Sequence, residues 1–61
     1  MWYFEAKYYD IIAGKTITRN IKFDGDNFLN SEKECYLYAM ERAYEMMKEN
    51  EMLDSVKFLA C

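Results

Sequence analysis

Two segments near the start of the chain alternate apolar and polar residues in the manner of β-strands. In residues 2–9 the main apolar side chains fall on even positions, and in residues 16–23 they fall on odd positions. A period of two predicts a strand with one buried face. Arg19 is the exception, since it falls on the apolar side of the second segment. We expect its guanidinium to stack on the Tyr8 ring and to reach water at the sheet edge.

A tight turn between these two segments predicts a β-hairpin. Ala13-Gly14 is expected to form a two-residue loop, because glycine adopts a positive φ without steric cost. This loop would set the pairing of the strands as Phe4 opposite Phe23, Ala6 opposite Ile21 and Glu5 opposite Lys22. In this register apolar residues meet apolar residues and an acid meets a base, which favours it.

The pattern from residue 31 onwards predicts a helix. Ser31 and Glu34 have the spacing of a capping box, in which both side chains bond free backbone amides of the first turn. The helix is expected to run from about 32 to about 50, with Asn50 near its end. One apolar face is expected to pack on the sheet: Tyr36, Leu37, Met40, Ala43, Tyr44 and Met47. A flanking apolar stripe is left unexplained by a single core: Cys35, Ala39 and Met46, with Tyr38 further round.

Alternation returns in residues 55–60, which are expected to form a third strand. Its two faces would carry Val56, Phe58 and Ala60 towards the core, and Lys57 and Leu59 away from it. The first strand is the most apolar, so we expect it at the centre of a three-stranded antiparallel sheet of order 2-1-3. The predicted fold is a single small α+β domain over residues 1–61, with the order β-β-α-β and the helix packed on one face. The expected core comprises Trp2, Phe4, Tyr8, Ile21, Phe23, Tyr36, Met40, Tyr44, Met47, Val56 and Phe58.

Composition adds a reason to expect association. The chain has 61 residues, with six Tyr, four Phe and one Trp, but no His and only two Cys. A chain of this length buries only about 60% of the surface that its unfolded form exposes. Domains below roughly 70 residues commonly need a disulfide, a metal, an unusually good core or an oligomeric partner. A zinc site of Cys and His lacks ligands here, which leaves the core and self-association as the expected sources of stability.

No residue pattern indicates catalysis, a metal or a cofactor. Asp24 and Asp26 begin like a calcium loop, but apolar residues occupy the later ligand positions, so a turn is expected. Cys35 lies in the first helical turn, yet no His exists to complete a Cys-His nucleophile. A disulfide between Cys35 and Cys61 under oxidising conditions is left open. The helix acids are expected on a solvated face, where they make poor general acids or bases. The protein is therefore expected to be non-enzymatic.

The start of the chain and its cysteine content favour a cytoplasmic protein. There is no basic leader and no apolar run of signal-peptide length, and two Cys fit a reducing compartment. No segment approaches the roughly 20 apolar residues of a membrane span, so no membrane partner is expected. The net charge of −3 is uneven, with +2 in residues 1–23 and −5 in residues 24–61. The first third is therefore basic and the rest acidic.

The outer face of the predicted sheet is the first candidate binding surface. It would carry aromatic rings interleaved with lysines, namely Tyr3, Lys7, Tyr9 and Lys22, with Thr18, Lys57 and Leu59 beside them. Such an arrangement has the physical logic of the platforms on which single-stranded nucleic acid stacks. Against this, the chain is acidic overall, and Tyr is common on exposed strands because of its β-propensity. A solvated face, a protein contact and a nucleic-acid contact are all left open, with nucleic acid the least favoured.

Self-association gives a second candidate surface. The third strand would be an edge guarded by the charge of Lys57 alone. The expected contact surface combines this edge with the flanking helix stripe: Cys35, Tyr38, Ala39, Met46, Lys57 and Leu59. We expect a twofold homodimer, alongside an unidentified protein partner. The alternatives are that Tyr38 and Met46 are isolated exposed side chains, that the chain is a nucleic-acid-binding accessory protein, or that it is an acidic inhibitor that mimics nucleic acid.

Overall fold

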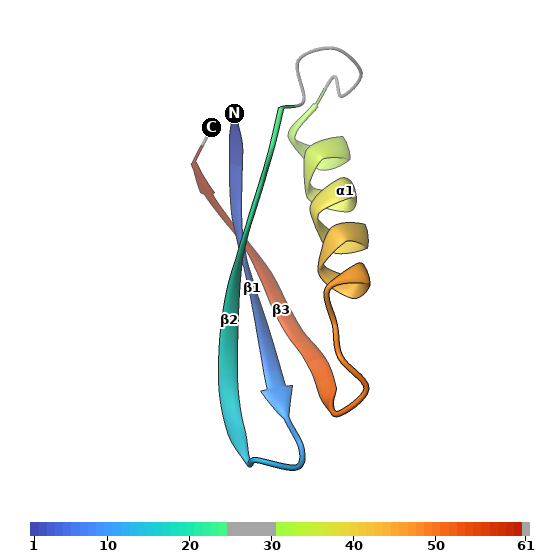
Figure 1. Cartoon of the computed structure of the whole chain (residues 1–61). Coiled ribbons are helices and arrows are strands. Elements are labelled where there is room, and N and C mark those ends of the chain that lie inside the picture. The colour runs from blue at the N-terminus through green and yellow to red at the C-terminus, as the bar shows by residue number, and fades with distance from the viewer. Residues whose placement is uncertain (25–30, 61) are drawn as a thin grey trace.

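Three strands and one helix occur in the residues that the computed structural model describes, 1–24 and 31–60 (Figure 1). Their bounds are β1 Trp2–Asp10, β2 Lys15–Phe23, α1 Glu32–Glu45 and β3 Glu51–Ala60. β1 pairs antiparallel with β2 on one side and with β3 on the other, and α1 lies along one face. The predicted α+β class, the β-β-α-β order and the 2-1-3 sheet are confirmed. No helix in these ranges has the length and apolar character that crossing a membrane requires. The turn predicted from Asp24 onwards falls mostly outside them.

The hairpin between β1 and β2 closes through residues 11–14, not through the predicted two-residue loop. Asp10 pairs with Lys15, and Asp10 Oδ1 accepts hydrogen bonds from the amides of Ile12 at 3.0 Å and Ala13 at 2.9 Å. Gly14 adopts a φ of 68°, and its amide donates to the Asp10 carbonyl at 2.8 Å. The longer loop shifts the pairing by two positions, so the predicted register is wrong. The observed pairs include Trp2 with Phe23, Phe4 with Ile21, Glu5 with Asn20 and Ala6 with Arg19. A shift of two preserves the alternation, so each side chain of β1 and β2 keeps its predicted face.

Helix α1 begins at the predicted cap but ends more than a turn before the predicted end. Ser31 Oγ accepts a hydrogen bond from the Glu34 amide at 3.2 Å, which confirms Ser31 as the N-cap. The last helical residue is Glu45. Beyond it, the Lys48 amide donates to Glu51 Oε1 at 2.9 Å, and the Glu51 amide donates to the Lys48 carbonyl at 3.0 Å. These bonds form the turn that leads into β3, and a longer helix would have to break them.

The face of α1 that packs on the sheet is rotated from the predicted one and shares with it the fully buried Ala43 and the partly buried Met40. Cys35, Ala39 and Ala43 have no exposed surface. The larger residues predicted for this face are 37–56% exposed: Tyr36, Leu37, Tyr44 and Met47. Small side chains at intervals of four form a low ridge on a helix, so the backbone of α1 can lie close to the strands. The residues of intermediate burial on α1 or at its C-cap are Tyr38, Met40 and Met46.

Phe4 lies at the centre of the core and has no exposed surface. The centroid of its ring is 5.8 Å from that of Phe23 and 5.5 Å from that of Phe58. Tyr8 is also fully buried, and its hydroxyl donates to the Ala43 carbonyl at 2.5 Å, which joins β1 to α1. The buried core cluster comprises Phe4, Ala6, Tyr8, Ile21, Cys35, Ala39, Ala43 and Val56. The predicted core is therefore correct for the sheet and wrong for most of the helix.

The pairing of β1 with β3 contains two irregularities of the β-bulge type. At one of them Phe4 pairs with Phe58 whereas Tyr3 pairs with Ala60, which leaves Leu59 as the extra residue. A bulge adds one residue and so reverses the alternation beyond it. Ala60 therefore lies on the outer face, not on the core face as predicted. β3 is also longer at its start than the sequence pattern predicts.

Candidate functional site on the outer face of the sheet

An ion pair between the half-buried Arg19 and the buried Glu51 joins β2 to β3 at the hairpin end of the sheet. Arg19 Nη1 and Nη2 donate to Glu51 Oε1 and Oε2 at 2.6 Å and 2.7 Å, a bidentate contact. Nη1 also donates to the Met46 carbonyl at 3.5 Å, and the guanidinium carbon lies 4.7 Å from the centre of the Tyr8 ring. The predicted stacking of Arg19 on Tyr8 is confirmed. The guanidinium ends at a carboxylate, however, and not in water at the sheet edge.

The carboxyls near this ion pair have lowered pKa values. Hydrogen bonds from Arg19, and secondly from the Lys48 amide, lower the pKa of Glu51 to about 2. Asp10 pairs with Glu51 across β1 and β3, and the hydrogen bond from the Ala13 amide lowers its pKa. A general acid or base must offer a proton or a lone pair to its substrate. Every buried side-chain nitrogen and oxygen in the described residues is instead hydrogen-bonded within the chain, so we assign this cluster a structural role.

The cysteine and the acids offer little for other chemistry. Within residues 1–24 and 31–60, no three His, Cys, Asp or Glu side chains gather closely enough to hold a metal ion. Cys35 is fully buried between α1 and the sheet, where a dissolved substrate cannot reach its thiol. The possible pairing of Cys35 with Cys61 involves a residue outside the described ranges.

The outer face of the sheet, opposite α1, consists of four rows that cross the three strands. Figure 1 shows α1 along the other face only. Each row places one residue of β1 between its partners on β2 and β3. The rows are Tyr3 with Lys22 and Ala60, Glu5 with Asn20 and Lys57, Lys7 with Thr18 and Ser55, and Tyr9 with Thr16 and Met52. The four residues predicted for this face, Tyr3, Lys7, Tyr9 and Lys22, therefore share one surface.

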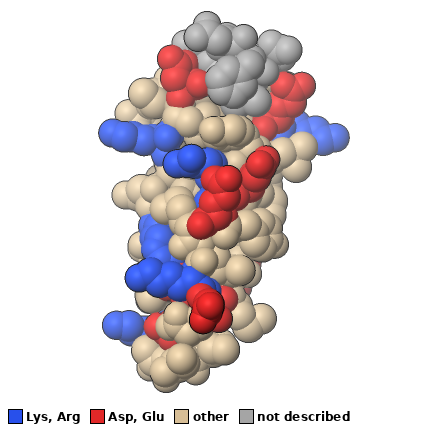
Figure 2. Space-filling view, turned by 45° about the vertical axis from the view of Figure 1, so that its right-hand side comes forward, with Lys and Arg blue, Asp and Glu red and all other residues tan. Residues whose placement is uncertain are grey.

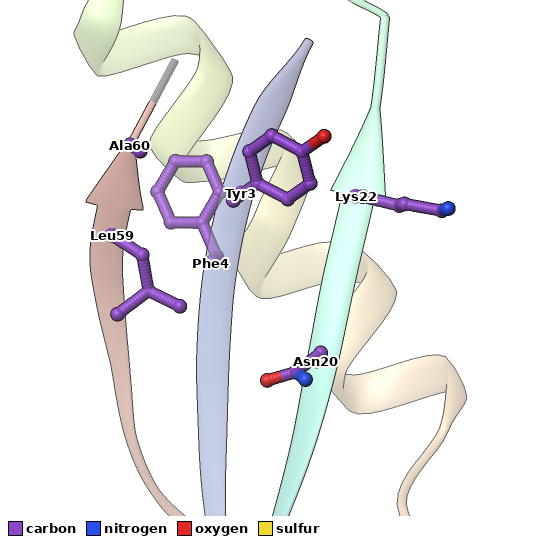
Figure 3. Close-up of a pocket in the computed structure, with 6 residues that line it drawn as sticks. All are labelled: Tyr3, Phe4, Asn20, Lys22, Leu59 and Ala60. Atoms are coloured by element: carbon purple, nitrogen blue, oxygen red, sulfur yellow. The ribbon is translucent and has the colours of Figure 1, made fainter.

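A hollow of about 470 Å³ lies at the first row (Figure 3). Its lining residues are Tyr3, Phe4, Asn20, Lys22, Leu59 and Ala60. The β-bulge contributes to it, because Leu59 and Ala60 both line the hollow beside Tyr3. Tyr3 is 43% exposed and Leu59 is 47% exposed. Figure 3 shows the Lys22 side chain pointing away from both, so this end of the face is mainly apolar.

The opposite end of the face presents a second apolar pair. Tyr9 and Met52 lie opposite each other on β1 and β3 and are 45% and 61% exposed. The hairpin loop beyond them adds two exposed isoleucines, Ile11 and Ile12. The alternation of residues 2–9 predicts Tyr9 on this face, whereas the sequence pattern does not predict Met52 there. The run over residues 51–54 has no clear alternation, so no signal separated this part of β3 from the end of the helix.

Charged residues of both signs lie between the two apolar ends. Glu5 and Lys7 occupy the middle of β1 and are half-buried. Glu5 is directly opposite Lys57 of β3. Opposite charges at facing positions stabilise neighbouring strands, so this pair supports the sheet as well as shaping its surface. The outer face is thus polar in its middle and apolar at both ends.

The self-association surface predicted from the sequence is split between the two faces of the sheet. Cys35 and Ala39 are fully buried in the core, so the helix stripe is not open to a partner. The other two residues of the stripe are of intermediate burial: Tyr38 and Met46. Exposed on the strands are Lys57 and Leu59. The prediction is wrong for the helix residues, because it assigned a different face of α1 to the core. Of the predicted surface, only the two β3 residues are exposed.

The outer face thus brings aromatic, apolar and charged side chains together on a regular scaffold. Comparison of the chain with protein-family models, with curated proteins and with solved structures found no match.

Proposed function

We propose that this chain is a non-enzymatic, cytoplasmic protein-interaction module that associates with itself through the outer face of its sheet. The observation that carries this proposal is the exposure of large apolar side chains at both ends of that face. Tyr3 and Leu59 lie at one end, Tyr9 and Met52 at the other, and all four are 43–61% exposed. Apolar groups that gather on one surface are typical of protein contacts, where aromatic residues and Met are enriched. A sheet also holds them in place, which limits the entropy lost on binding.

The small size of the chain gives association a thermodynamic role. A 61-residue chain can build only a small core, and five of the eight buried core side chains in residues 1–24 and 31–60 belong to the sheet. A partner that binds only the folded state stabilises that state by mass action. Burial of the outer face against a second copy would therefore add to the stability that one small core supplies.

Nucleic acid is the less favoured ligand of this face. The rings of Tyr3 and Tyr9 are about 20 Å apart along β1 at roughly 3.4 Å per residue, too far to stack neighbouring bases. Glu5 lies between them and would repel a phosphate backbone. The lysines of the face supply positive charge, but the chain as a whole carries −3.

The acidic-inhibitor alternative requires a continuous negative surface, in imitation of a phosphate backbone. Figure 2 brings the helix side of the molecule forward and shows Lys and Arg side chains among the Asp and Glu side chains along its length. On α1 itself, Arg42 Nη1 lies 3.8 Å from Glu45 Oε1. Mixed charge of this kind is typical of an ordinary solvated helix surface.

Light scattering during size-exclusion chromatography tests the proposed surface. At about 100 µM we expect a mass above the 7.4 kDa of one chain, falling towards it on dilution. Leu59→Lys should abolish association, because it puts a charge at an apolar end of the face. Leu37→Lys is the matched control, since Leu37 is 56% exposed on α1 and Leu59 is 47% exposed. A single-chain mass at every concentration would contradict the proposal, as would association that survives Leu59→Lys but not Leu37→Lys.

A further inference from the structure

The outward residues of β1 form a pattern that is complementary to its own reverse. From one end of the strand to the other they are Tyr3, Glu5, Lys7 and Tyr9, which is aromatic, acidic, basic and aromatic. The two tyrosines are exposed, the two charged residues are half-buried, and all four lie on the central strand of the open face. In the reverse direction the order is aromatic, basic, acidic and aromatic. A second copy laid antiparallel on this face therefore meets each side chain with its complement.

Two twofold arrangements would stack this face on a second copy, and their charge contacts differ. With the axis along the strands, each row faces itself, so Glu5 meets Glu5 and Lys7 meets Lys7. With the axis across the strands, Glu5 of each chain faces Lys7 of the other, and Tyr3 faces Tyr9. Like charges that face each other oppose association, whereas unlike charges favour it. We propose, on the basis of the proposed function, that two chains bind face to face, with β1 antiparallel to β1 of the second copy and the twofold axis across the strands.

The flanking strands agree with this arrangement. An axis across the strands keeps β3 over β3 and reverses the order of its rows. Leu59 and Ala60 would then face Met52 of the second copy, so apolar side chains meet at both ends of the interface. The hollow beside Leu59 offers about 470 Å³ to that methionine, whose flexible side chain adapts to irregular spaces. On β2, Asn20 would face Thr18, and both side chains can donate and accept hydrogen bonds.

The area of the face sets the expected strength of this dimer. Three strands about 4.8 Å apart, with about 3.3 Å per residue, give a projected area of about 400 Å² per chain. Stable interfaces bury roughly 800 Å² per partner, so this one belongs to the weak, reversible class. We therefore expect a dissociation constant in the micromolar range, which is within reach of analytical ultracentrifugation.

Charge reversal at Glu5 and at Lys7, in separate variants, tests the arrangement. Sedimentation equilibrium measures the dissociation constant of each dimer. Glu5→Lys and Lys7→Glu should each weaken dimerisation about 100-fold, because two pairs of unlike charges become like charges. An equimolar mixture of the two variants should recover association as a heterodimer, in which the lysines at positions 5 and 7 of one chain face the acids at positions 7 and 5 of the other. Glu5→Gln removes one charge at constant size and should weaken dimerisation about 10-fold. Glu41→Lys makes the same charge change as Glu5→Lys on the exposed side of α1 and should leave the dimer unchanged.

The axis along the strands predicts the opposite result for Glu5→Gln, because it would relieve the repulsion between two facing acids. Stronger or unchanged dimerisation of Glu5→Gln, in a wild type that associates and is sensitive to Leu59→Lys, would overturn this arrangement and leave the proposed function standing. Failure of the two charge-reversal variants to associate when mixed would overturn it as well, provided that circular dichroism shows both folded. If either is unfolded, Glu5→Gln decides alone. A wild type that stays a single chain would overturn both proposals.

Discussion

Arg19 lies on the core side of β2, where an unpaired charge would be costly, and two neighbours, Tyr8 and Glu51, accommodate it. Its guanidinium lies over the Tyr8 ring and donates two short hydrogen bonds to Glu51. Glu51 is itself fixed by the Lys48 amide at 2.9 Å. A bidentate pair whose two charged groups hydrogen-bond to each other is far more favourable than either charge alone in the same place. The pair therefore holds β2, β3 and the turn after α1 in a single arrangement.

Glu51→Gln should lower the melting temperature at pH 7 by about 10 °C, because it leaves the Arg19 charge without its counter-ion in a half-buried position. Circular dichroism during heating measures this change. Glu49→Gln is the control, since Glu49 is an exposed acid in the same turn, and we expect a change below about 2 °C. Equal melting temperatures for the two variants would show that the ion pair contributes nothing specific.

The same measurement over a range of pH checks the sign of this contribution. The pKa of Glu51 is lowered from 4.5 to about 2, so the folded state binds this proton more weakly than the unfolded state. The contribution of the pair is complete above pH 4.5 and is lost as the pH falls towards about 2. Asp10 acts in the same direction, because its pKa is also lowered. The melting temperature of the wild type should therefore fall further between pH 4.5 and about 2 than that of Glu51→Gln.

At the scale of elements, α1 contacts the sheet through its smallest side chains. The aromatic rings of Phe4 and Tyr8 already fill the layer between the helix and β1, so the helix can add little volume there. Cys35, Ala39 and Ala43 meet this requirement. A helical wheel weights side chains by their hydrophobicity and not by their volume, and it therefore placed the larger residues against the sheet.

Ala39→Leu should destabilise the protein by about 1–3 kcal/mol, because three extra carbon atoms would be forced between α1 and the sheet. Leu37→Ala, on the exposed side of the same helix, should change the free energy of unfolding by less than about 0.5 kcal/mol. Urea denaturation of both variants measures the difference. The reverse order of effects would mean that the large residues face the sheet after all.

Local patterns predicted the elements, whereas tertiary contacts decided their ends and their register. The alternation of the strands and the Ser31 cap lie within single segments, so the sequence reveals them. The hairpin register depends on the Asp10 carboxylate, which holds a longer loop that the turn residues alone do not indicate. The helix stops before Asn50 because its last turn gives way to contacts with β3. The outer face was predictable from its alternation, except for Met52 and Ala60, whose positions follow from strand pairing and a bulge.

At the scale of the whole molecule, one face of the sheet is packed and the other is open. The packed face supports a small core, and the open face carries exposed apolar side chains at both ends. The proposed dimer would stack the two open faces and place a helix on each outer side, giving a symmetric arrangement of four layers. The apolar ends of the face that a single chain exposes to water would then be buried.

The most direct measurement of this proposal is a dilution series followed by nuclear magnetic resonance, from about 1 mM to about 10 µM, a range that brackets a micromolar dissociation constant. We expect concentration-dependent shifts on the outer face of the sheet, with the rings of Tyr3 and Tyr9 among the largest. The ring of Tyr44, exposed on α1 to a similar extent, should not shift. Spectra that do not change with concentration, or shifts confined to α1, would contradict association through the outer face.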